Sequence, residues 1–317
     1  MVEHLTDLDA ATLSTGDIFS KISSAFSVSC DTDGSDIIIT GEDNLGIVRA
    51  GEALRTMNIL AQDNELEPRT VDYIIFLAGK GQTEEFLASS DEIYYTTPSG
   101  RSIKAKTLGQ HVYLDALRRS ELVICSGPAG SGKTFLGVAM AVRAFRNREV
   151  SKIILTRPAI EAGERLGFLP GDIEEKVDPY MRPIYDAIEA LLGRELFDRY
   201  YEKGLIEVSP LAFMRGRNLD DCFVLLDEAQ NTTADQMKMF LTRLGMNCRA
   251  CVCGDFTQID LPRGVRDGLH DSMEVLQDLK EVSIVSLSNC DIVRNSLVQK
   301  IVEAYERRDR KGDTVQL

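Results

Sequence analysis

The sequence contains an eight-residue stretch, 127–134, that reads GPAGSGKT and matches the pattern GxxxxGK[ST]. Its three glycines allow positive φ angles and a close approach of the main chain to a bound anion. The amides of such a loop converge on phosphate at the start of a helix, where unpaired N–H groups and the helix dipole favour negative charge. The motif therefore predicts a phosphate-binding turn that joins a strand to a helix.

The residues around and within this loop support the same interpretation. Residues 122–125 form an apolar run typical of a strand, and apolar residues recur at helical spacing after the loop. Lys133 is expected to reach the β- and γ-phosphates of a nucleoside triphosphate, and the Thr134 hydroxyl to ligate Mg²⁺. The residues expected to contact the nucleotide are Gly127, Pro128, Ala129, Gly130, Ser131, Gly132, Lys133 and Thr134.

Two adjacent acids, Asp227 and Glu228, follow a second apolar run at 222–226. If this run is a buried parallel strand, both carboxylates lie at its carboxyl end, beside the phosphate-binding loop. Asp227 is expected to hold Mg²⁺ through water, and Glu228 to orient and deprotonate the attacking water. The two motifs together predict a magnesium-dependent hydrolysis of the triphosphate.

Two glutamines are candidates for further contacts with the nucleotide. Gln258 ends the sequence GDFTQ, which directly follows the apolar run 250–253. An amide in that place can sense the γ-phosphate because it donates and accepts hydrogen bonds without adding charge, although Gly-Asp is also common in ordinary turns. Gln110 could pair with both N6 and N7 of adenine and so select ATP over GTP.

Several arginines are candidates for stabilising the charge that develops on the γ-phosphate during its transfer. The sequence alone does not distinguish among them, or say whether the arginine comes from the same subunit. For each one, a surface position or a structural salt bridge is the alternative. The candidates are Arg157, Arg215, Arg217, Arg263 and Arg294.

From residue 107 onward, apolar runs of strand length alternate with amphipathic helical stretches. Strands that are apolar throughout and alternate with helices indicate an α/β domain whose mostly parallel sheet is covered on both faces. This domain is expected over 107–306, followed by a polar tail at 307–317. The expected strands are 122–125, 153–155, 205–208, 223–226, 250–253 and 282–285.

The first 90 residues carry no catalytic motif and predict a small, acidic α+β domain. Short strands are expected at 26–29 and 37–40, with helices at 46–60 and 70–77. Residues 91–106 are expected to form a linker that includes a hairpin. Residues 1–100 hold 5 basic and 18 acidic side chains, a net charge of −13, which leaves −1 of the total −14 for the rest. Such acidity argues against a broad electrostatic surface for nucleic acid and suits a soluble domain or a basic protein partner.

The composition places the chain among reduced, soluble proteins. No apolar run approaches 20 residues, and the first 20 residues lack a basic-then-apolar start, so neither a membrane span nor a secretory signal is expected. Seven widely spread cysteines indicate a reducing compartment, and hence a cytoplasmic protein. Cys248, Cys251 and Cys253 lack a second pair of metal ligands and are expected to be buried thiols.

With these motifs in place, the chain resembles the PhoH-like ATPases over about Thr107 to Tyr305, and residues 1–90 resemble the KH-like amino-terminal domain of longer members. Two positions depart from the family pattern: Cys253 stands where Thr is usual, and Asn295-Ser296 where His-Pro is expected. The segments that carry the resemblance are KTLGQ (106–110), GPAGSGKT (127–134), LTRPA (155–159), EAGERLGFLPGD (161–172), PLAFMRGR (210–217), LDEAQN (226–231) and GDFTQIDLPRG (254–264).

The resemblance implies one RecA-like motor domain with ATPase activity and a role in RNA metabolism. It also implies a hexameric ring with ATP at subunit interfaces, in which Arg263 or Arg294 would act on the neighbouring subunit's nucleotide. No nuclease domain is attached, and the KH-like domain shows no clear GxxG loop with basic flanks, so RNA binding by that domain is not expected.

Three functions remain open on the sequence. The first is an ATPase that couples hydrolysis to the movement, unwinding or remodelling of RNA, with single-stranded RNA as partner. The second is an ATP-dependent switch or assembly factor that acts on a protein, for example at the ribosome. The third, a small-molecule kinase, is disfavoured because Glu228 follows Asp227, an arrangement that suits water as the acceptor.

Overall fold

The computed structural model describes residues 1–14, 17–62, 66–158, 173–262 and 264–293, together with positions 298, 301, 305 and 308. Two compact units are present. One contains Met1–Asp91, and the other is Glu92–Arg294. Among the described residues, no helix has both the length and the apolar character that crossing a bilayer requires.

The first unit is a small α+β domain with a three-stranded antiparallel sheet in the order β1-β3-β2. Phe26 ends a helix rather than starting a strand, because Ser27 adopts a left-handed conformation (φ 55°) that stops the helix before Val28. The strands are β1 (Val2–Leu5), β2 (Val28–Asp33) and β3 (Asp36–Gly41). The helices are α1 (Ala10–Leu13), α2 (Ile18–Phe26), α3 (Asn44–Ala61), α4 (Pro68–Lys80) and α5 (Thr83–Ser90).

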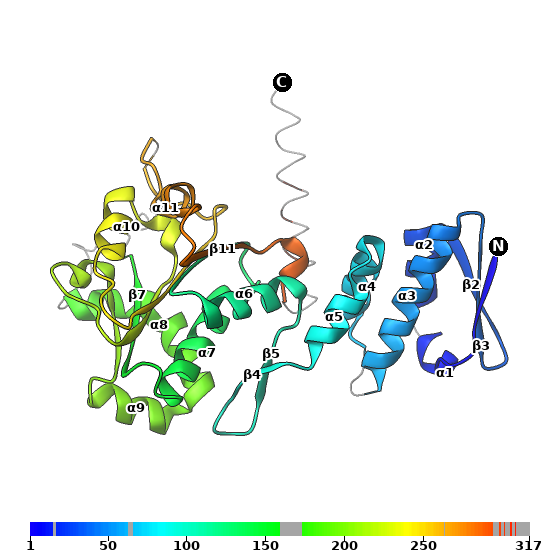
Figure 1. The fold of residues 1–317 in the computed structure, drawn as a ribbon, viewed down its shortest axis with the longest axis horizontal. Helices are drawn as coiled ribbons and strands as arrows, with labels where there is room; N and C mark the ends of the chain where they lie inside the picture. Colours follow the sequence, from blue (N-terminus) through cyan, green and yellow to red (C-terminus); the bar gives the residue numbers. More distant parts are fainter. Residues whose placement is uncertain are drawn as a thin grey trace. The chain divides into compact units, whose positions relative to one another are not determined.

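The second unit, which contains the strands labelled β7 and β11 in Figure 1, is built on a six-stranded parallel sheet in the order β11-β6-β10-β9-β7-β8. All five neighbouring pairs are parallel, which confirms the expected α/β fold class. The strands are β6 (Leu122–Ser126), β7 (Lys152–Arg157), β8 (Ile206–Pro210), β9 (Cys222–Leu226), β10 (Arg249–Gly254) and β11 (Val282–Ser286).

Helices cover both faces of this sheet, and the strand residues alternate between two cores. Val123, Cys125 and Leu225 belong to the core beneath α6, α7, α8 and α9, whereas Ile124 and Leu226 belong to the core beneath α10 and α11. This double burial explains why the strands appear in the sequence as continuous apolar runs. The helices are α6 (Leu108–Arg119), α7 (Lys133–Arg146), α8 (Ile173–Leu192), α9 (Arg194–Glu202), α10 (Ala234–Leu241) and α11 (Gly268–Leu276).

The segment 91–106, expected to be a linker, belongs instead to the core of the second unit. The expected hairpin is confirmed, and its strands are β4 (Ile93–Thr96) and β5 (Ser102–Lys104). Tyr94, Tyr95 and Ile103 are buried in the same core as α6 and α7, and the Tyr95 hydroxyl donates to the carbonyl of Leu191 at 3.2 Å. The hairpin is retained there because two aromatic rings and an isoleucine leave water together.

The strand order brings four strand ends together at the carboxyl edge of the sheet. β6 and β10 are neighbours, as are β10 with β9 and β9 with β7. The loops that follow these four strands begin at Gly127, Asp255, Asp227 and Pro158, so the sequence motifs meet at one edge although they are far apart in the chain.

Gly254, the last residue of β10, lies where no side chain fits. A Cβ at this position would be 2.5 Å from Gln230 Oε1 and 2.8 Å from Leu269 Cδ2. We therefore expect Gly254→Ala to lower the free energy of unfolding by about 1–3 kcal/mol, as measured by denaturant unfolding. Gly79→Ala in α4 is the matched control, because the nearest heavy atom to its added Cβ is 3.9 Å away. Equal stability of Gly254→Ala and wild type would contradict the steric argument.

Candidate nucleotide-binding and catalytic site

The loop 127–134 forms a preorganised turn between β6 and α7. Gly130 (φ 84°) and Gly132 (φ 86°) adopt left-handed conformations that require glycine, and α7 begins at Lys133 directly after them. The loop is tied to the end of β10, since Gly127 N donates to Gly254 O at 3.1 Å, and it is braced internally, since Ser131 Oγ donates to Pro128 O at 2.7 Å. The first amides of α7 therefore point into an open turn suited to phosphate.

Lys133 lies within the curve of this loop, and the residue is 8% exposed. Its ammonium donates to Gly127 O at 2.5 Å and to Pro128 O at 2.9 Å. A phosphate oxygen is a charged acceptor and forms stronger hydrogen bonds with an ammonium than a neutral carbonyl does. The loop thus holds the lysine at the place where a phosphate would take over its hydrogen bonds.

Thr134 and Asp227 provide a pair of oxygen atoms that fits a magnesium ion. Thr134 Oγ1 donates to Asp227 Oδ1 at 2.7 Å, and Asp227 is 2% exposed. A hydroxyl and a carboxylate side by side are the hard oxygen ligands that Mg²⁺ takes together with phosphate oxygens and water. These two residues would hold the ion that the sequence motifs imply.

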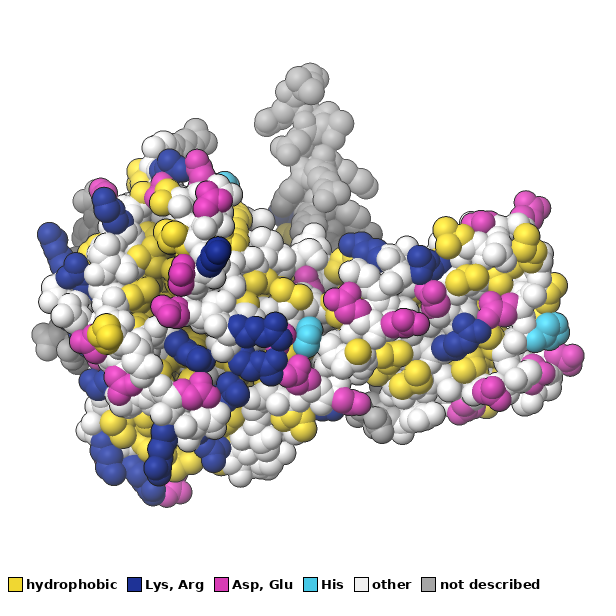
Figure 2. All heavy atoms as spheres, in the orientation of Figure 1, with side chains coloured by type: hydrophobic (Ala, Val, Ile, Leu, Met, Phe, Trp, Pro, Cys, Tyr) yellow, Lys and Arg dark blue, Asp and Glu magenta, His cyan; other side chains and the backbone are white. Residues whose placement is uncertain are grey.

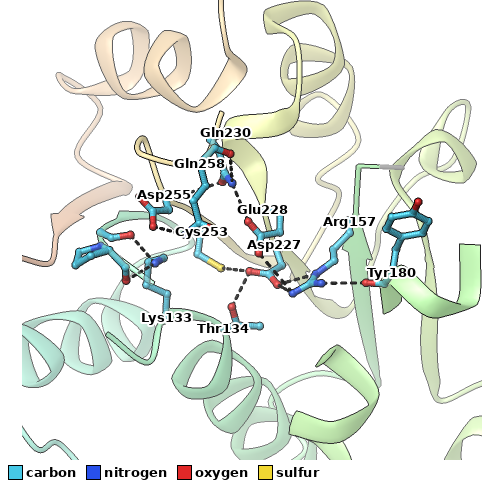
Figure 3. A network of polar contacts seen from close by, with 12 residues as sticks. Lys133, Thr134, Arg157, Tyr180, Asp227, Glu228, Gln230, Cys253, Asp255 and Gln258 are labelled. Carbon is cyan, nitrogen blue, oxygen red and sulfur yellow. Dashed lines mark hydrogen bonds and ion pairs between the residues drawn. The ribbon is translucent and has the colours of Figure 1, made fainter. Parts of the chain in front are cut away.

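Asp227 also accepts hydrogen bonds from two further side chains, as Figure 3 shows. Its Oδ2 accepts from Nε of Arg157 at 2.8 Å and from Nη2 of the same guanidinium. Its Oδ1 accepts from the thiol of Cys253 at 3.2 Å. The remaining guanidinium nitrogen, Nη1, donates to the carbonyl of Tyr180 in α8 at 2.9 Å. The carboxylate is therefore held on both oxygens.

Glu228 has an unusual backbone conformation for a residue with a side chain. Its φ of 53° and ψ of 38° lie in the left-handed region, and the chain then enters the 3₁₀ turn Ala229–Asn231. Such conformations in non-glycine residues are concentrated at functional sites. The turn directs the half-exposed Glu228 carboxylate toward a cavity of about 190 Å³ that is also lined by Arg157, Gln230 and Gln258.

Gln230 is a site residue to which the sequence analysis assigned no role. It is fully buried, and its Nε2 donates to Glu228 Oε2 at 2.7 Å and to the carbonyl of Gln258 at 3.1 Å. Its Oε1 accepts from the main-chain amide of Asp255 at 3.0 Å. In the sequence, the one signal for a role of Gln230 is its position two residues after the acid pair. That position does not reveal that this amide joins Glu228 to the loop after β10.

Gln258 lies at the same cavity as Glu228, as the γ-phosphate-sensing role would require. Its Nε2 donates to Asp255 Oδ2 at 2.6 Å. Burial tends to raise the pKa of Asp255, but hydrogen bonds from Thr257 and Gln258 outweigh it and keep the pKa below its ordinary value. Asp255 therefore remains a charged acceptor that holds the Gln258 amide in place.

Gln110 lies against the phosphate-binding loop from the side of α6. The residue is 3% exposed, and its Nε2 donates to the carbonyl of Ser131 at 3.0 Å while its Oε1 accepts from Lys106 N at 2.9 Å. These two contacts leave one amide N–H and one oxygen lone pair for a ligand. The structure thus places Gln110 next to the loop that would carry the nucleotide.

The candidate arginines fall into different environments. Arg157 is the one whose guanidinium contacts Asp227, whereas Arg217 pairs with Glu207, to which its Nη2 donates at 2.9 Å (acceptor Oε2). Arg215 is exposed. Arg263 and Arg294 lie outside the described residues, so their proposed role stays a prediction.

If Glu228 is the base of an ATP-hydrolysing site, Gln230→Ala should lower kcat by about 10- to 100-fold, because Glu228 loses the donor that orients it. KM for ATP should change little, since Gln230 does not touch the phosphate-binding loop. Steady-state phosphate release measures both constants. Asn231→Ala is the matched control: Asn231 Oδ1 accepts from Asp260 N at 2.8 Å, on the same loop but away from Glu228. An equal loss of kcat in both variants would show that the turn, rather than Glu228 orientation, is responsible.

The comparisons with known proteins agree with these motifs. The family described as PhoH-like protein matches residues 102–306. The PhoH-like protein of Bacillus subtilis (strain 168) is 47% identical over 278 residues, which cover 88% of this chain and 87% of the relative. The PhoH-like protein of Mycobacterium tuberculosis (strain ATCC 25618 / H37Rv) is 49% identical over 255 residues, covering 80% and 72%.

More distant similarities add little to this assignment. Protein PhoH of Escherichia coli (strain K12) is 48% identical over 206 residues, 64% of this chain and 58% of that protein. The UvsW helicase from bacteriophage T4 matches with a TM-score of 0.34 and 13% identity, over 79% of this chain and 95% of that chain, and is too dissimilar to bear on the site. On the strength of the family match and the relatives of similar length, the chain belongs to the family of PhoH-like proteins.

Proposed function

We propose that this protein is a magnesium-dependent ATPase that binds ATP at the loop 127–134 and hydrolyses it. The observation that carries the proposal is the meeting of this loop with the Thr134–Asp227 oxygen pair and Glu228 at one edge of the sheet. Thr134 and Asp227 would hold Mg²⁺, which when bound offsets the negative charge of the phosphates. Membership of the PhoH-like family supports the same activity.

The protein residues divide the work of hydrolysis among them. Lys133 exchanges its carbonyl partners for the β- and γ-phosphates and holds them against the amides of α7. Glu228, held by Gln230, orients the attacking water and accepts its proton. Gln258 contacts the γ-phosphate end of the cavity and responds to its loss. Gln110 has one N–H and one lone pair left for adenine, and so favours ATP over GTP.

The proposed use of this activity is the remodelling or unwinding of RNA in the cytoplasm, with single-stranded RNA as the partner that the protein binds. The support is the family resemblance, and in a hexameric ring Arg263 or Arg294 would complete a neighbouring subunit's site. Basic and acidic side chains are interspersed over Glu92–Arg294 on the face seen in Figure 2, so that RNA contact there would be local rather than along a broad basic surface.

A second candidate is an ATP-dependent switch whose partner is a protein, for example one at the ribosome. The observation that favours it is the net charge of −13 over residues 1–100, and acidic side chains predominate over the first unit on the face seen in Figure 2. A basic protein would be attracted to such a surface. Deletion of residues 1–91 separates the two candidates. If the protein is a switch that binds its partner through this unit, the deletion should abolish recovery of the partner. If it acts on RNA through the second unit, RNA-stimulated hydrolysis should remain intact.

The test of the proposed function is an ATPase assay on purified protein with single-stranded RNA, with DNA and without polymer, at several salt concentrations. Phosphate release that needs Mg²⁺ but no acceptor is expected, and RNA should raise the rate. The solution mass, measured on the same sample with and without ATP, tests the hexamer. Absence of phosphate release under all conditions would refute the ATPase, and a rate insensitive to RNA would refute the RNA role alone.

A further inference from the structure

Arg157 is brought to the metal-binding carboxylate by the pairing of two strands that are 70 residues apart. It is the last residue of β7, which pairs in parallel with β9, and the main-chain amide of Asp227 donates to Thr156 O at 2.9 Å. This register sets the Arg157 side chain directly beside Asp227. The two side chains are 13% and 3% exposed, so the ion pair between them is largely buried.

The Asp227 carboxylate has all its hydrogen-bonding partners before any metal arrives. Arg157 provides two donors to Oδ2, and the hydroxyl of Thr134 and the thiol of Cys253 provide two donors to Oδ1. A buried carboxylate costs free energy unless it is paired and hydrogen-bonded, and this one is both. A metal ion that bound Oδ1 would have to displace the hydrogen bond from Thr134. It would also meet a carboxylate whose negative charge is already paired.

The guanidinium beside Asp227 opposes the entry of a free divalent cation. Asp227 is paired with Arg157, and the same guanidinium lies 3.8 Å from Oε1 of Glu228. Two neighbouring carboxylates therefore share one buried cation, and Glu228, with its side chain 40% exposed, is also in contact with water. A second, doubly charged cation beside the guanidinium would be repelled over a short distance in a medium that screens charge weakly. The oxygens of a bound triphosphate would supply the negative charge that offsets this repulsion of the divalent cation.

We propose that Arg157 supplies the positive charge at Asp227 in the nucleotide-free protein, so that a divalent cation enters this site only together with the nucleotide. Arg157 is then a positioning residue that acts through Asp227 and sets the order of binding. The inference rests on the proposed function, since it concerns the cation of the same site.

The test uses Mn²⁺ as the probe, with free Mn²⁺ measured by electron paramagnetic resonance at pH 8. Wild-type protein should bind Mn²⁺ weakly at this site without nucleotide and much more tightly with ADP. Arg157→Gln removes the cation and keeps an amide of similar length, and it should bind Mn²⁺ about tenfold or more tightly than wild type in the absence of nucleotide. The double variant Arg157→Gln/Asp227→Asn should lose that gain, which assigns it to this carboxylate.

Two further variants separate charge from general structure. Arg157→Lys keeps the positive charge and should bind nucleotide-free Mn²⁺ as weakly as wild type. Arg217→Gln removes another arginine–carboxylate pair, whose carboxylate, Glu207, lies on the neighbouring strand β8. This variant should also bind nucleotide-free Mn²⁺ as weakly as wild type. Equal gains in Arg217→Gln and Arg157→Gln would overturn the proposal.

The wild-type titration can overturn the inference even if Arg157→Gln does not fold. Tight Mn²⁺ binding at Asp227 without nucleotide, lost in Asp227→Asn, would overturn the inference, as would a folded Arg157→Gln protein with wild-type Mn²⁺ affinity. Either result could occur in a protein that hydrolyses ATP normally. By contrast, failure of the wild type to bind ATP in the same buffers would refute the proposed function itself.

Discussion

The Glu228→Gln protein is expected to bind ATP with near wild-type affinity and to hydrolyse it about 100-fold or more slowly. Glutamine has the shape of glutamate but cannot take the proton of the attacking water. The Gln230 Nε2 donor, 2.7 Å from Glu228 Oε2, can still bond the amide oxygen of the new side chain, so the local structure should persist. Equilibrium binding of a fluorescent ATP analogue and single-turnover phosphate release measure the two quantities separately.

Glu149→Gln is the appropriate control for loss of a carboxylate elsewhere in the unit. Glu149 pairs with Arg249 at 3.1 Å, at the opposite end of β10 from the loop that begins at Asp255. Replacement of Glu149 should therefore leave turnover unchanged. Hydrolysis at the wild-type rate by the Glu228→Gln protein would remove Glu228 from the role of base. A parallel loss of ATP binding would instead indicate that the residue supports the nucleotide rather than the water.

The second large effect is expected at Lys133, whose replacement by alanine should abolish measurable ATP binding. Its ammonium is the single side-chain cation that the described part of the loop 127–134 provides. Truncating one member of a buried, hydrogen-bonded charge pair costs about 2–5 kcal/mol, which corresponds to an affinity loss of about 30-fold or more. Isothermal titration of ATP in the presence of Mg²⁺ measures this loss.

Lys152→Ala provides the control, because Lys152 begins β7 at the end of the sheet away from the phosphate-binding loop. The folded state of Lys133→Ala can be checked by its unfolding midpoint, which should stay close to that of wild type. The fold should not depend on this ammonium, because it donates to two carbonyls of its own loop. Undiminished ATP affinity in Lys133→Ala would exclude this loop as the nucleotide site.

The expected strands of the second unit and the turn at 127–134 lie where local sequence patterns placed them. A strand buried on both faces needs apolar residues throughout, so runs such as 222–226 are visible without any knowledge of their partners. The positions of Gly130 and Gly132 likewise express a local backbone requirement. The acid pair after β9 and the loop after β10 could be assigned to the site because parallel strands end at one edge.

The burial of the hairpin at 91–106 and the first helices of the chain show where local patterns are insufficient. Tyr94 and Tyr95 lie in a segment that was expected to be a linker with a hairpin, close to the turn residues Pro98-Ser99-Gly100. Their burial depends on the surface that α6 and α7 offer, which the segment itself does not encode. Helix α2 was likewise not expected, and it ends at Phe26, within a stretch that was expected to be a strand.

The sequence by itself determined the phosphate-binding loop, the acid pair and the parallel α/β fold, because each follows from requirements on neighbouring residues. The tertiary structure alone decided that Arg157 lies on Asp227, that Gln230 holds Glu228, and that Cys253 donates to the same carboxylate. Those contacts depend on strand order and register, since β7, β9 and β10 are adjacent in the sheet but well separated in the chain. A side chain's nearest charged partner is set by such long-range pairing, and no local pattern specifies it.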